Sequence, residues 1–175
     1  VPKEIKVRES RVGLVPNSVA ELTGRGHSVL VETGAGAGIG AGDDAYRAAG
    51  AEIAASAADV FAKAEMIVKV KEPQPNEWVQ LSADQILFTY LHLAADIAQT
   101  RGLMESGCTA IAYETITDDA GGLPLLAPMS EVAGRLSVIE GAANLKANAG
   151  GRGLLISGVP GTSPAEVVVL SLIHI

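Results

Sequence analysis

Three side chains that could handle a small anionic substrate follow apolar runs with the character of β-strands. "MIVKVKEP" leads to Lys71, "ILFTYLHL" to His92, and "AIAYET" to Glu114. In open parallel sheets ligands bind beyond the carboxyl ends of the strands, so residues at neighbouring strand ends share one crevice. A lysine, a histidine and a carboxylate at such an edge suit anion binding and a proton transfer. Lys69 is expected on the same face as Lys71, because side chains alternate along a strand.

Each of these residues also has a structural explanation. Lys71 is equally a solvated charge at a strand end, His92 a hydrogen-bonded histidine of the core, and Glu114 a partner of Lys71 or a cap for a loop. Their coincidence at three strand ends favours a shared functional site. Arg11, in "ESRVGLVP", stands in a loop before the first expected helix, where a surface role is the default. We expect no metal site.

The elements that must position these residues alternate along the chain. Strands are expected within residues 28–32, 66–70, 85–91 and 109–114. Helices are expected within residues 15–27, 44–49, 56–65 and 94–107, the third capped by Ser56. Helices alternating with nearly all-apolar strands indicate an α/β fold, a parallel sheet with helices on both faces.

A loop over residues 115–128 breaks this alternation, and the longest helix is expected after it, from about Ser130 to Asn148. Its apolar residues Val132, Leu136 and Ile139 fall on one face at helical spacing. Residues 165–170, "AEVVVL", are expected to form the first strand of a second domain.

The glycine-rich stretch "VETGAGAGIGAGDD", residues 31–44, resembles a nucleotide-binding loop. A dinucleotide fingerprint needs G-x-G-x-x-G or G-x-G-x-x-A at the start of a helix, and an acidic residue about 20 positions later. Gly36, Gly38 and Ala41 fit only the looser form, the following helix is short, and no acidic residue closes the next strand. We interpret this stretch as a flexible connection between strand and helix.

Composition excludes several classes of protein. Hydrophobic residues make up 48% of the 175 residues and aromatic residues only 3%, which predicts a core of small aliphatic side chains and argues against disorder. A net charge of −7 disfavours nucleic acid or an anionic membrane surface as partner. A single cysteine, Cys108, and the absence of an apolar run of about 20 residues or a secretory pattern indicate a soluble, cytoplasmic protein.

Five motifs, in this order, resemble the N-terminal half of the alanine dehydrogenase family: "ESRVGLVP", "VKVKEP", "LFTYLHLA", "IAYET" and "PLLAPMSEVAGR". The resemblance runs from Val1 to about Leu170. The soluble α subunit of nicotinamide nucleotide transhydrogenase shares this architecture, but it does not keep the lysine of "KVKEP" or the histidine of "LHLA", and this sequence has both. The resemblance implies a Rossmann-like substrate domain.

The resemblance also implies a function: reversible oxidation of L-alanine by NAD to pyruvate and ammonia, in a homo-oligomer. Arg11 and Lys71 would hold the substrate carboxylate, and His92 would be the general acid/base. Glu114 would stand close to the site and hold other site residues in place without contacting the substrate itself. Met129 would lie close to the substrate and Ser130 to the cofactor, where Ser130 also resembles a helix N-cap.

The family pattern divides the chain into three parts. Residues 1–127 would be the N-terminal part of the substrate domain, and 128–170 the linking helix and the start of an NAD-binding domain. Residues 171–175 are expected to be foreign to the family, because "AEVVVL" runs into "SLIHI" instead of a glycine-rich loop. A truncated or mis-read frame is therefore expected, with a chain that is inactive alone. The alternatives are the NAD(H)-binding α subunit of a proton-translocating transhydrogenase and a non-catalytic module that binds pyruvate.

Overall fold

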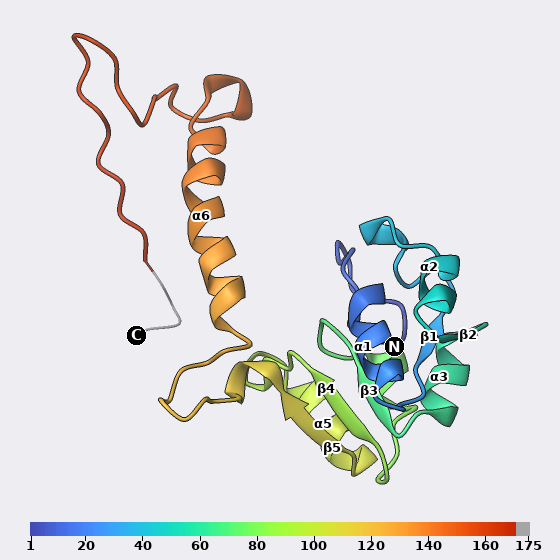
Figure 1. Ribbon diagram of the computed structural model, residues 1–175. Helices are drawn as coiled ribbons and strands as arrows, with labels where there is room; N and C mark the ends of the chain where they lie inside the picture. Colours follow the sequence, from blue (N-terminus) through green and yellow to red (C-terminus); the bar gives the residue numbers. More distant parts are fainter. Residues whose placement is uncertain (171–175) are drawn as a thin grey trace. The chain divides into compact units, whose positions relative to one another are not determined.

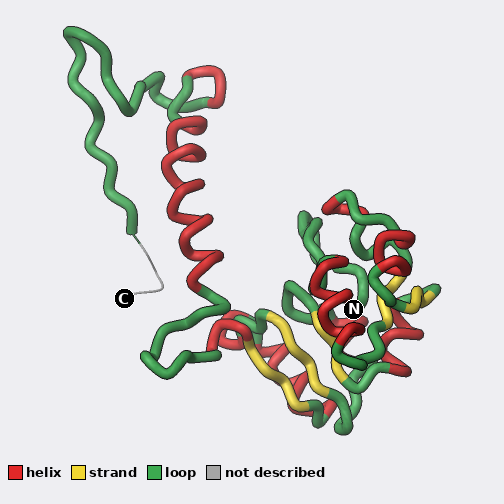
Figure 2. The backbone as a smooth tube through the Cα atoms, viewed as in Figure 1, coloured by secondary structure: helices red, strands yellow, loops and turns green. Residues whose placement is uncertain are grey.

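The computed structural model describes residues 1–170, so the five C-terminal residues expected to be foreign to the family lie outside it. The chain divides into two units, Val1–Leu123 and the part from Pro124 onward (Figures 1 and 2). The first unit alternates short strands and helices. The second contains one long helix, α6 (Ala127–Asn144), drawn in orange in Figure 1.

The first unit contains two short parallel sheets. β1 (Leu30–Glu32) pairs with β2 (Glu52–Ala54). β3 (Met66–Val68), β4 (Ile86–Thr89) and β5 (Thr109–Ala112) form the second sheet in the order β3-β4-β5. All pairs are parallel, as the alternation of strands with crossover segments requires. The sequence analysis expected a single sheet and did not identify β2.

The helices of the first unit begin and end at local signals. α1 (Pro16–Gly24) has a proline in its first turn, and Ser56 caps α3 (Ala57–Lys63) by accepting the N–H of Asp59 at 3.2 Å, as expected. Asp96 caps α5 in the same way. The remaining helices are α2 (Asp43–Ala48), α4 (Pro75–Trp78), which the sequence analysis missed, α5 (Ile97–Ser106) and the 3-10 turns η1 (Ala37–Ile39), η2 (Leu93–Ala95) and η3 (Tyr113–Thr115).

Two apolar clusters form the core of this unit. Ile67 of β3 and Leu87 of β4 are fully buried in one cluster, which also includes residues of α3 and α5. Val31 of β1 is fully buried in the other, against residues of α1 and α2. Burying one such side chain contributes about 1.5–3 kcal/mol, so the two clusters hold the strands that carry the polar strand ends. β5 is one of the two edge strands of the three-stranded sheet and is mostly exposed.

The second unit corrects one expectation and leaves another without support. α6 begins at Ala127 with Pro128 in its first turn, so Ser130 is inside the helix and not its N-cap. The Ser130 hydroxyl instead donates to the carbonyl of Leu126 at 3.4 Å. A proline fixes φ in the helical range and removes an N–H that the first turn leaves unpaired, and this sets the earlier start. The helix ends at Asn144, before the expected Asn148, and η4 (Ala147–Ala149) follows.

No strand is assigned to residues 165–170. A strand exists only through hydrogen bonds to a neighbour, and within the described part of the chain this segment meets none that continues a ladder; Ala165 donates to the carbonyl of Ile156 at 2.9 Å. The apolar residues of α6 are exposed, including Val132, Leu136 and Ile139. Over residues 1–170, no helix is both long and apolar enough to cross a membrane.

Candidate active site

The carboxyl ends of β3, β4 and β5 meet at one edge of the three-stranded sheet. The register aligns Val68 with Phe88 and Phe88 with Ile111, so the residues that follow each strand leave the sheet side by side. Lys71 follows β3, His92 follows β4, and Glu114 lies in the turn after β5. The structure therefore brings these three predicted residues to the same edge, where parallel sheets bind ligands.

Glu114 is bound to the backbone that carries His92. Its carboxylate accepts the N–H of Leu91 at 3.1 Å and the N–H of His92 at 2.7 Å. His92 itself adopts a left-handed conformation, with φ 49° and ψ 41°. This region is uncommon for a residue with a Cβ and is kept only where the surroundings fix it. Glu114 thus caps the turn after β4, one of the two structural roles considered for it, and in doing so fixes the position of His92.

The imidazole of His92 is half exposed and is held from two sides. The ring stacks on Tyr90, with ring centroids 5.9 Å apart and an interplanar angle of 18°. Its Nδ1 lies 3.6 Å from Oε2 of Glu72, a carboxylate that forms an ion pair with Lys6 through its other oxygen. Glu72 was not singled out in the sequence analysis.

Three partly buried aromatic residues form a chain of ring contacts that ends at His92. Tyr90 meets Tyr113 edge to face, with ring centroids 5.0 Å apart, and Tyr113 meets Phe88 in the same way at 4.3 Å. Burial raises the pKa of Tyr113 and, less strongly, that of Tyr90, so both phenols stay neutral at physiological pH. Such edge-to-face pairs are rigid and keep the ring stacked on His92 in place.

Lys69 and Lys71 have different surroundings. Lys69 is buried, with 1% of its side chain exposed, and its ammonium bonds to Glu77 at 2.8 Å and to Glu4 at 3.2 Å. This is a structural ion-pair network, so Lys69 does not join the site. Lys71 is half-buried, and its carbonyl accepts the hydroxyl of Thr89 at 2.9 Å, which ties the end of β3 to β4.

Arg11 reaches the same edge from the N-terminal loop. Its guanidinium bonds to Glu9 through Nε at 2.9 Å and through Nη2 at 2.6 Å, a bidentate contact. This contact holds the pKa of Glu9 well below its ordinary value, at about 2; burial opposes the shift, and the charge of Lys71 adds to it. The same hydrogen bonds to Glu9 raise the pKa of Arg11; burial opposes this shift, and the charges of Glu9, Tyr90 and Glu4 add to it. The charges of Arg11 and Lys71 both lower the pKa of Glu9, and the charge of Arg11 also lowers that of Tyr90.

Gly13 explains how the loop of Arg11 is fixed. A Cβ at position 13 would lie 2.6 Å from the carbonyl oxygen of Val68, the last residue of β3. Only glycine permits the loop to pack this closely on the strand end. The pattern R-x-G in "SRVGLVP" was the available signal for this glycine. The strand on which Gly13 packs lies 55 residues away in sequence, so local spacing did not reveal the contact.

The glycine-rich stretch does not fit a dinucleotide. The element that follows Gly36 is the 3-10 turn η1, not a long helix with free N–H groups. A Cβ at Gly36 would lie 2.6 Å from the ring of Tyr46, and one at Gly38 would lie 2.1 Å from the carbonyl oxygen of Ser10. These glycines serve internal packing, and they leave no open cradle for a pyrophosphate.

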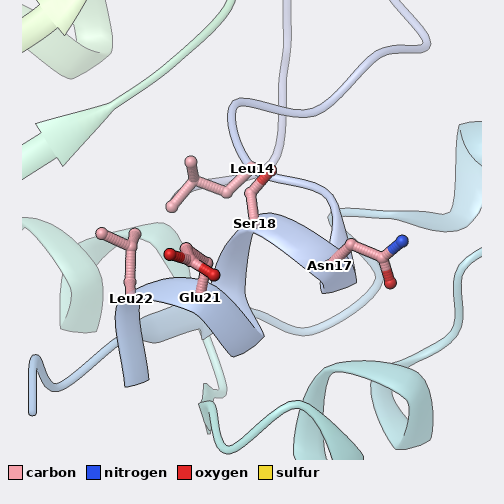
Figure 3. Close-up of a pocket in the computed structure, with 5 residues that line it drawn as sticks. All are labelled: Leu14, Asn17, Ser18, Glu21 and Leu22. Carbon is pink, nitrogen blue, oxygen red and sulfur yellow. The ribbon is translucent and has the colours of Figure 1, made fainter. Parts of the chain in front are cut away.

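One further feature of the first unit lies beside α1. An open hollow beside α1 is lined by Leu14, Asn17, Ser18, Glu21 and Leu22 (Figure 3). It offers no cation for an acidic ligand, and its one carboxylate pairs with Arg25 at 2.6 Å. No group of three or more metal-ligating side chains occurs within residues 1–170. Met129 and Ser130 lie on α6, in the second unit.

The fold and this edge define a class, a Rossmann-like α/β protein with cationic and acid–base side chains at the carboxyl ends of a parallel sheet. Residues 1–133 match the family described as "Alanine dehydrogenase/PNT, N-terminal domain", and the chain belongs to this family.

Individual relatives agree. The chain is 56% identical over 170 residues to alanine dehydrogenase of Halomonas elongata, covering 97% of this chain and 46% of the relative. A solved structure of L-alanine dehydrogenase superposes with a TM-score of 0.85 at 55% identity, over 94% of this chain and 45% of that one. A transhydrogenase from Sinorhizobium meliloti is less similar, with a TM-score of 0.60 at 30% identity over 64% of this chain and 33% of that one. The chain thus spans about half the length of the curated relatives it matches.

Proposed function

We propose that the whole protein oxidises L-alanine with NAD to pyruvate and ammonia, reversibly, and that residues 1–127 supply the N-terminal part of its substrate domain. The observation that carries this proposal is the convergence of Arg11, Lys71 and His92 at the carboxyl edge of the sheet β3-β4-β5. Similarity to alanine dehydrogenases at 56% identity supports the choice of substrate.

Arg11 and Lys71 would bind the carboxylate of alanine or pyruvate. The Arg11 guanidinium already holds a carboxylate through two hydrogen bonds, that of Glu9, so its geometry suits this role. Lys71 adds a compact positive charge that already acts on the same carboxylate. Two cations offset the cost of removing a substrate carboxylate from water, and they fix the orientation of its α-carbon.

His92 would move protons during the hydrolysis of the imine. As water adds to the imine carbon, the imidazole accepts the proton that the water loses. It then returns that proton to the amine nitrogen and takes up the proton of the carbinolamine hydroxyl as the carbon–nitrogen bond breaks, so that the carbonyl forms and ammonia leaves. Free imidazole titrates near pH 6.5, so such a group accepts and donates near neutrality, and it contributes roughly 10²–10⁴ in rate.

NAD would accept the hydride from the α-carbon when it is bound. The glycine-rich stretch of residues 31–44 does not fit it, as the contacts of Gly36 and Gly38 establish, so we assign no cofactor step to that stretch. For this chain we propose only that residues 128–170 adjoin the NAD-binding part, with Ser130 close to the cofactor and Met129 close to the substrate.

The experiment is an assay of alanine-dependent NADH formation by a full-length protein that carries this sequence. We expect activity that requires both L-alanine and NAD, in a cytoplasmic homo-oligomer. Transhydrogenase chemistry would instead give NAD(H) binding with no dependence on alanine, and this result would overturn the proposal.

A second experiment separates the enzyme from a non-catalytic binding module. Isothermal titration of the 175-residue chain with pyruvate measures whether Arg11 and Lys71 bind a carboxylate without the rest of the protein. We expect binding that Lys71→Ala abolishes and that Lys63→Ala, at an exposed position on α3, leaves intact. Binding together with an inactive full-length protein would favour the module.

A further inference from the structure

Glu72 is a largely buried carboxylate, and one of its two oxygens has no hydrogen-bond partner. It follows β3 directly after Lys71, with 13% of its side chain exposed. Its Oε1 pairs with the ammonium of Lys6. Its Oε2 is the one buried side-chain nitrogen or oxygen in the described part of the chain that has no hydrogen-bond partner. A buried acceptor without a hydrogen-bond donor destabilises the folded protein, because it has lost its bonds to water. A donor close to this oxygen is therefore expected to bind it.

The donor that faces this oxygen is the imidazole of His92. Nδ1 of His92 lies 3.6 Å from Oε2 of Glu72, longer than a hydrogen bond, which spans about 2.7–3.2 Å. A shift of roughly half an ångström closes it, and rotation of the half-exposed ring about its own bonds supplies such a shift. The backbone of His92 cannot drift away, because Glu114 holds its N–H at 2.7 Å.

We propose that Glu72 is a positioning residue for His92: it accepts the Nδ1–H of the imidazole and leaves Nε2 free to exchange protons with the substrate. The inference rests on the acid/base role proposed for His92. A neutral imidazole carries one N–H, and the hydrogen bond made by one nitrogen decides the state of the other. With the proton fixed on Nδ1, the lone pair is on Nε2, where a base must have it.

Lys6 determines which oxygen of Glu72 faces His92. An ammonium only donates, so Oε1 of Glu72 is committed to Lys6 and Oε2 is left for His92. Three other groups surround the ring or its backbone. Tyr90 stacks on one face, Glu114 binds the backbone N–H, and Arg11 acts on Tyr90 from the neighbouring loop. Glu72, in contrast, is the group that the structure places at Nδ1.

The variant Glu72→Gln tests this proposal, because it replaces one acceptor oxygen of the carboxylate with a hydrogen-bond donor, the amide NH₂. The side-chain oxygen of glutamine will go to Lys6, which needs an acceptor, and the amide NH₂ then faces His92. Nδ1 must now accept a hydrogen bond, so the proton moves to Nε2. The same shape of side chain therefore selects the opposite tautomer.

The measurement is the tautomer of His92, read from ¹⁵N chemical shifts of the imidazole in the 175-residue chain at about pH 8.5, above the ordinary titration of imidazole. The sequence contains three histidines, and His27, exposed before β1, is the internal reference. We expect His92 to be mainly Nδ1–H in the wild type and mainly Nε2–H in Glu72→Gln. Glu105→Gln, at an exposed position on α5, is the matched control and should change nothing.

Two more variants extend the test, and the wild-type tautomer decides it alone if Glu72→Gln does not fold. Lys6→Met should keep the Nδ1–H form, since Glu72 still accepts. Lys6→Met combined with Glu72→Gln frees the amide to rotate and should restore much of the Nδ1–H form. A wild-type His92 that is mainly Nε2–H, or a tautomer that ignores Glu72→Gln in a folded chain, would overturn the proposal.

Kinetics of the full-length protein separate this inference from the proposed function. If both hold, Glu72→Gln lowers kcat for alanine oxidation at least tenfold with little change in KM, because the substrate carboxylate contacts are untouched. If the tautomer reverses while activity persists in both Glu72→Gln and His92→Gln, the contact is real but His92 is not the acid/base. An unchanged kcat in Glu72→Gln beside a large loss in His92→Gln would overturn the positioning role alone.

Discussion

The carboxylate of Glu114 accepts the backbone N–H of His92 at 2.7 Å, across the boundary between β4 and β5. This bond joins the ends of two strands and holds His92 in a left-handed conformation. A second bond, from the N–H of Leu91 at 3.1 Å, reinforces it. Glu114 thus acts on the proposed acid/base through the backbone, and substitutions at Glu114 should affect both stability and catalysis.

Removing this carboxylate leaves two backbone N–H groups without their acceptor. Glu114→Ala should lower the free energy of unfolding by about 2 kcal/mol, the typical loss for hydrogen bonds to a charged group. Glu114→Gln keeps one acceptor oxygen and should lose less. Urea denaturation measures both. Glu105→Ala, exposed on α5, is the control and should stay within about 0.5 kcal/mol of the wild type. Equal stabilities for Glu114→Ala and the control would contradict the capping role.

Lys71 should affect substrate binding more than turnover. Lys71→Ala removes one of the two cations proposed for the substrate carboxylate, so KM for L-alanine should rise about tenfold or more in the full-length protein. Lys63→Ala makes the same change at an exposed position on α3 and should leave KM unaltered. A normal KM in Lys71→Ala would exclude its role in binding the carboxylate.

The pairing of Glu9 with Arg11 predicts a pH dependence of stability. The folded protein holds the pKa of Glu9 at about 2, against an ordinary value of 4.5, chiefly through its hydrogen bonds with Arg11. A depressed carboxyl pKa contributes stability above the unfolded value, and this contribution is lost as pH falls toward the folded value. Wild type should therefore exceed Glu9→Gln in stability at pH 7. The difference should shrink between about pH 4.5 and pH 2 in urea titrations; a difference that persists or grows on acidification would have the wrong sign.

Gly13 should tolerate no side chain. Gly13→Ala places a Cβ 2.6 Å from the carbonyl oxygen of Val68, and we expect a loss of about 1–3 kcal/mol in unfolding free energy together with a higher KM, because the loop carries Arg11. Gly24→Ala is the matched control, since a Cβ there meets nothing within 4 Å and replaces glycine at the end of α1. That control should be neutral or slightly stabilising. Comparable losses in both variants would contradict the close packing of the loop on β3.

Much of the arrangement was predictable from local patterns. Apolar strands followed by Lys71, His92 and Glu114 predicted the shared edge, because the carboxyl ends of parallel strands coincide whatever the details of packing. Ser56 correctly predicted the start of α3, because its hydroxyl accepts a backbone N–H of the first turn. The glycine-rich stretch failed the fingerprint in sequence, and its contacts with Tyr46 and Ser10 explain the glycines without a ligand.

What could not be predicted depends on partners distant in sequence. Lys69 and Lys71 have the same residue type two positions apart, yet Glu4 and Glu77 bury the first and leave the second at the edge. Glu72 carried no local signal for its contact with His92, which is 20 positions away in sequence. Ser130 has the right residue type for a cap, but Pro128 starts α6 earlier. Only the three-dimensional fold decides among such alternatives.

The most direct test of the central claim is the turnover of His92→Gln beside His27→Gln in the full-length protein. His27 is an exposed histidine before β1, so its substitution is matched in chemistry and should leave kcat unchanged. We predict that His92→Gln folds normally and loses roughly 10²–10⁴ in kcat for alanine-dependent NADH formation. A folded His92→Gln variant with nearly wild-type kcat would contradict the assignment of the acid/base to the carboxyl edge of the sheet.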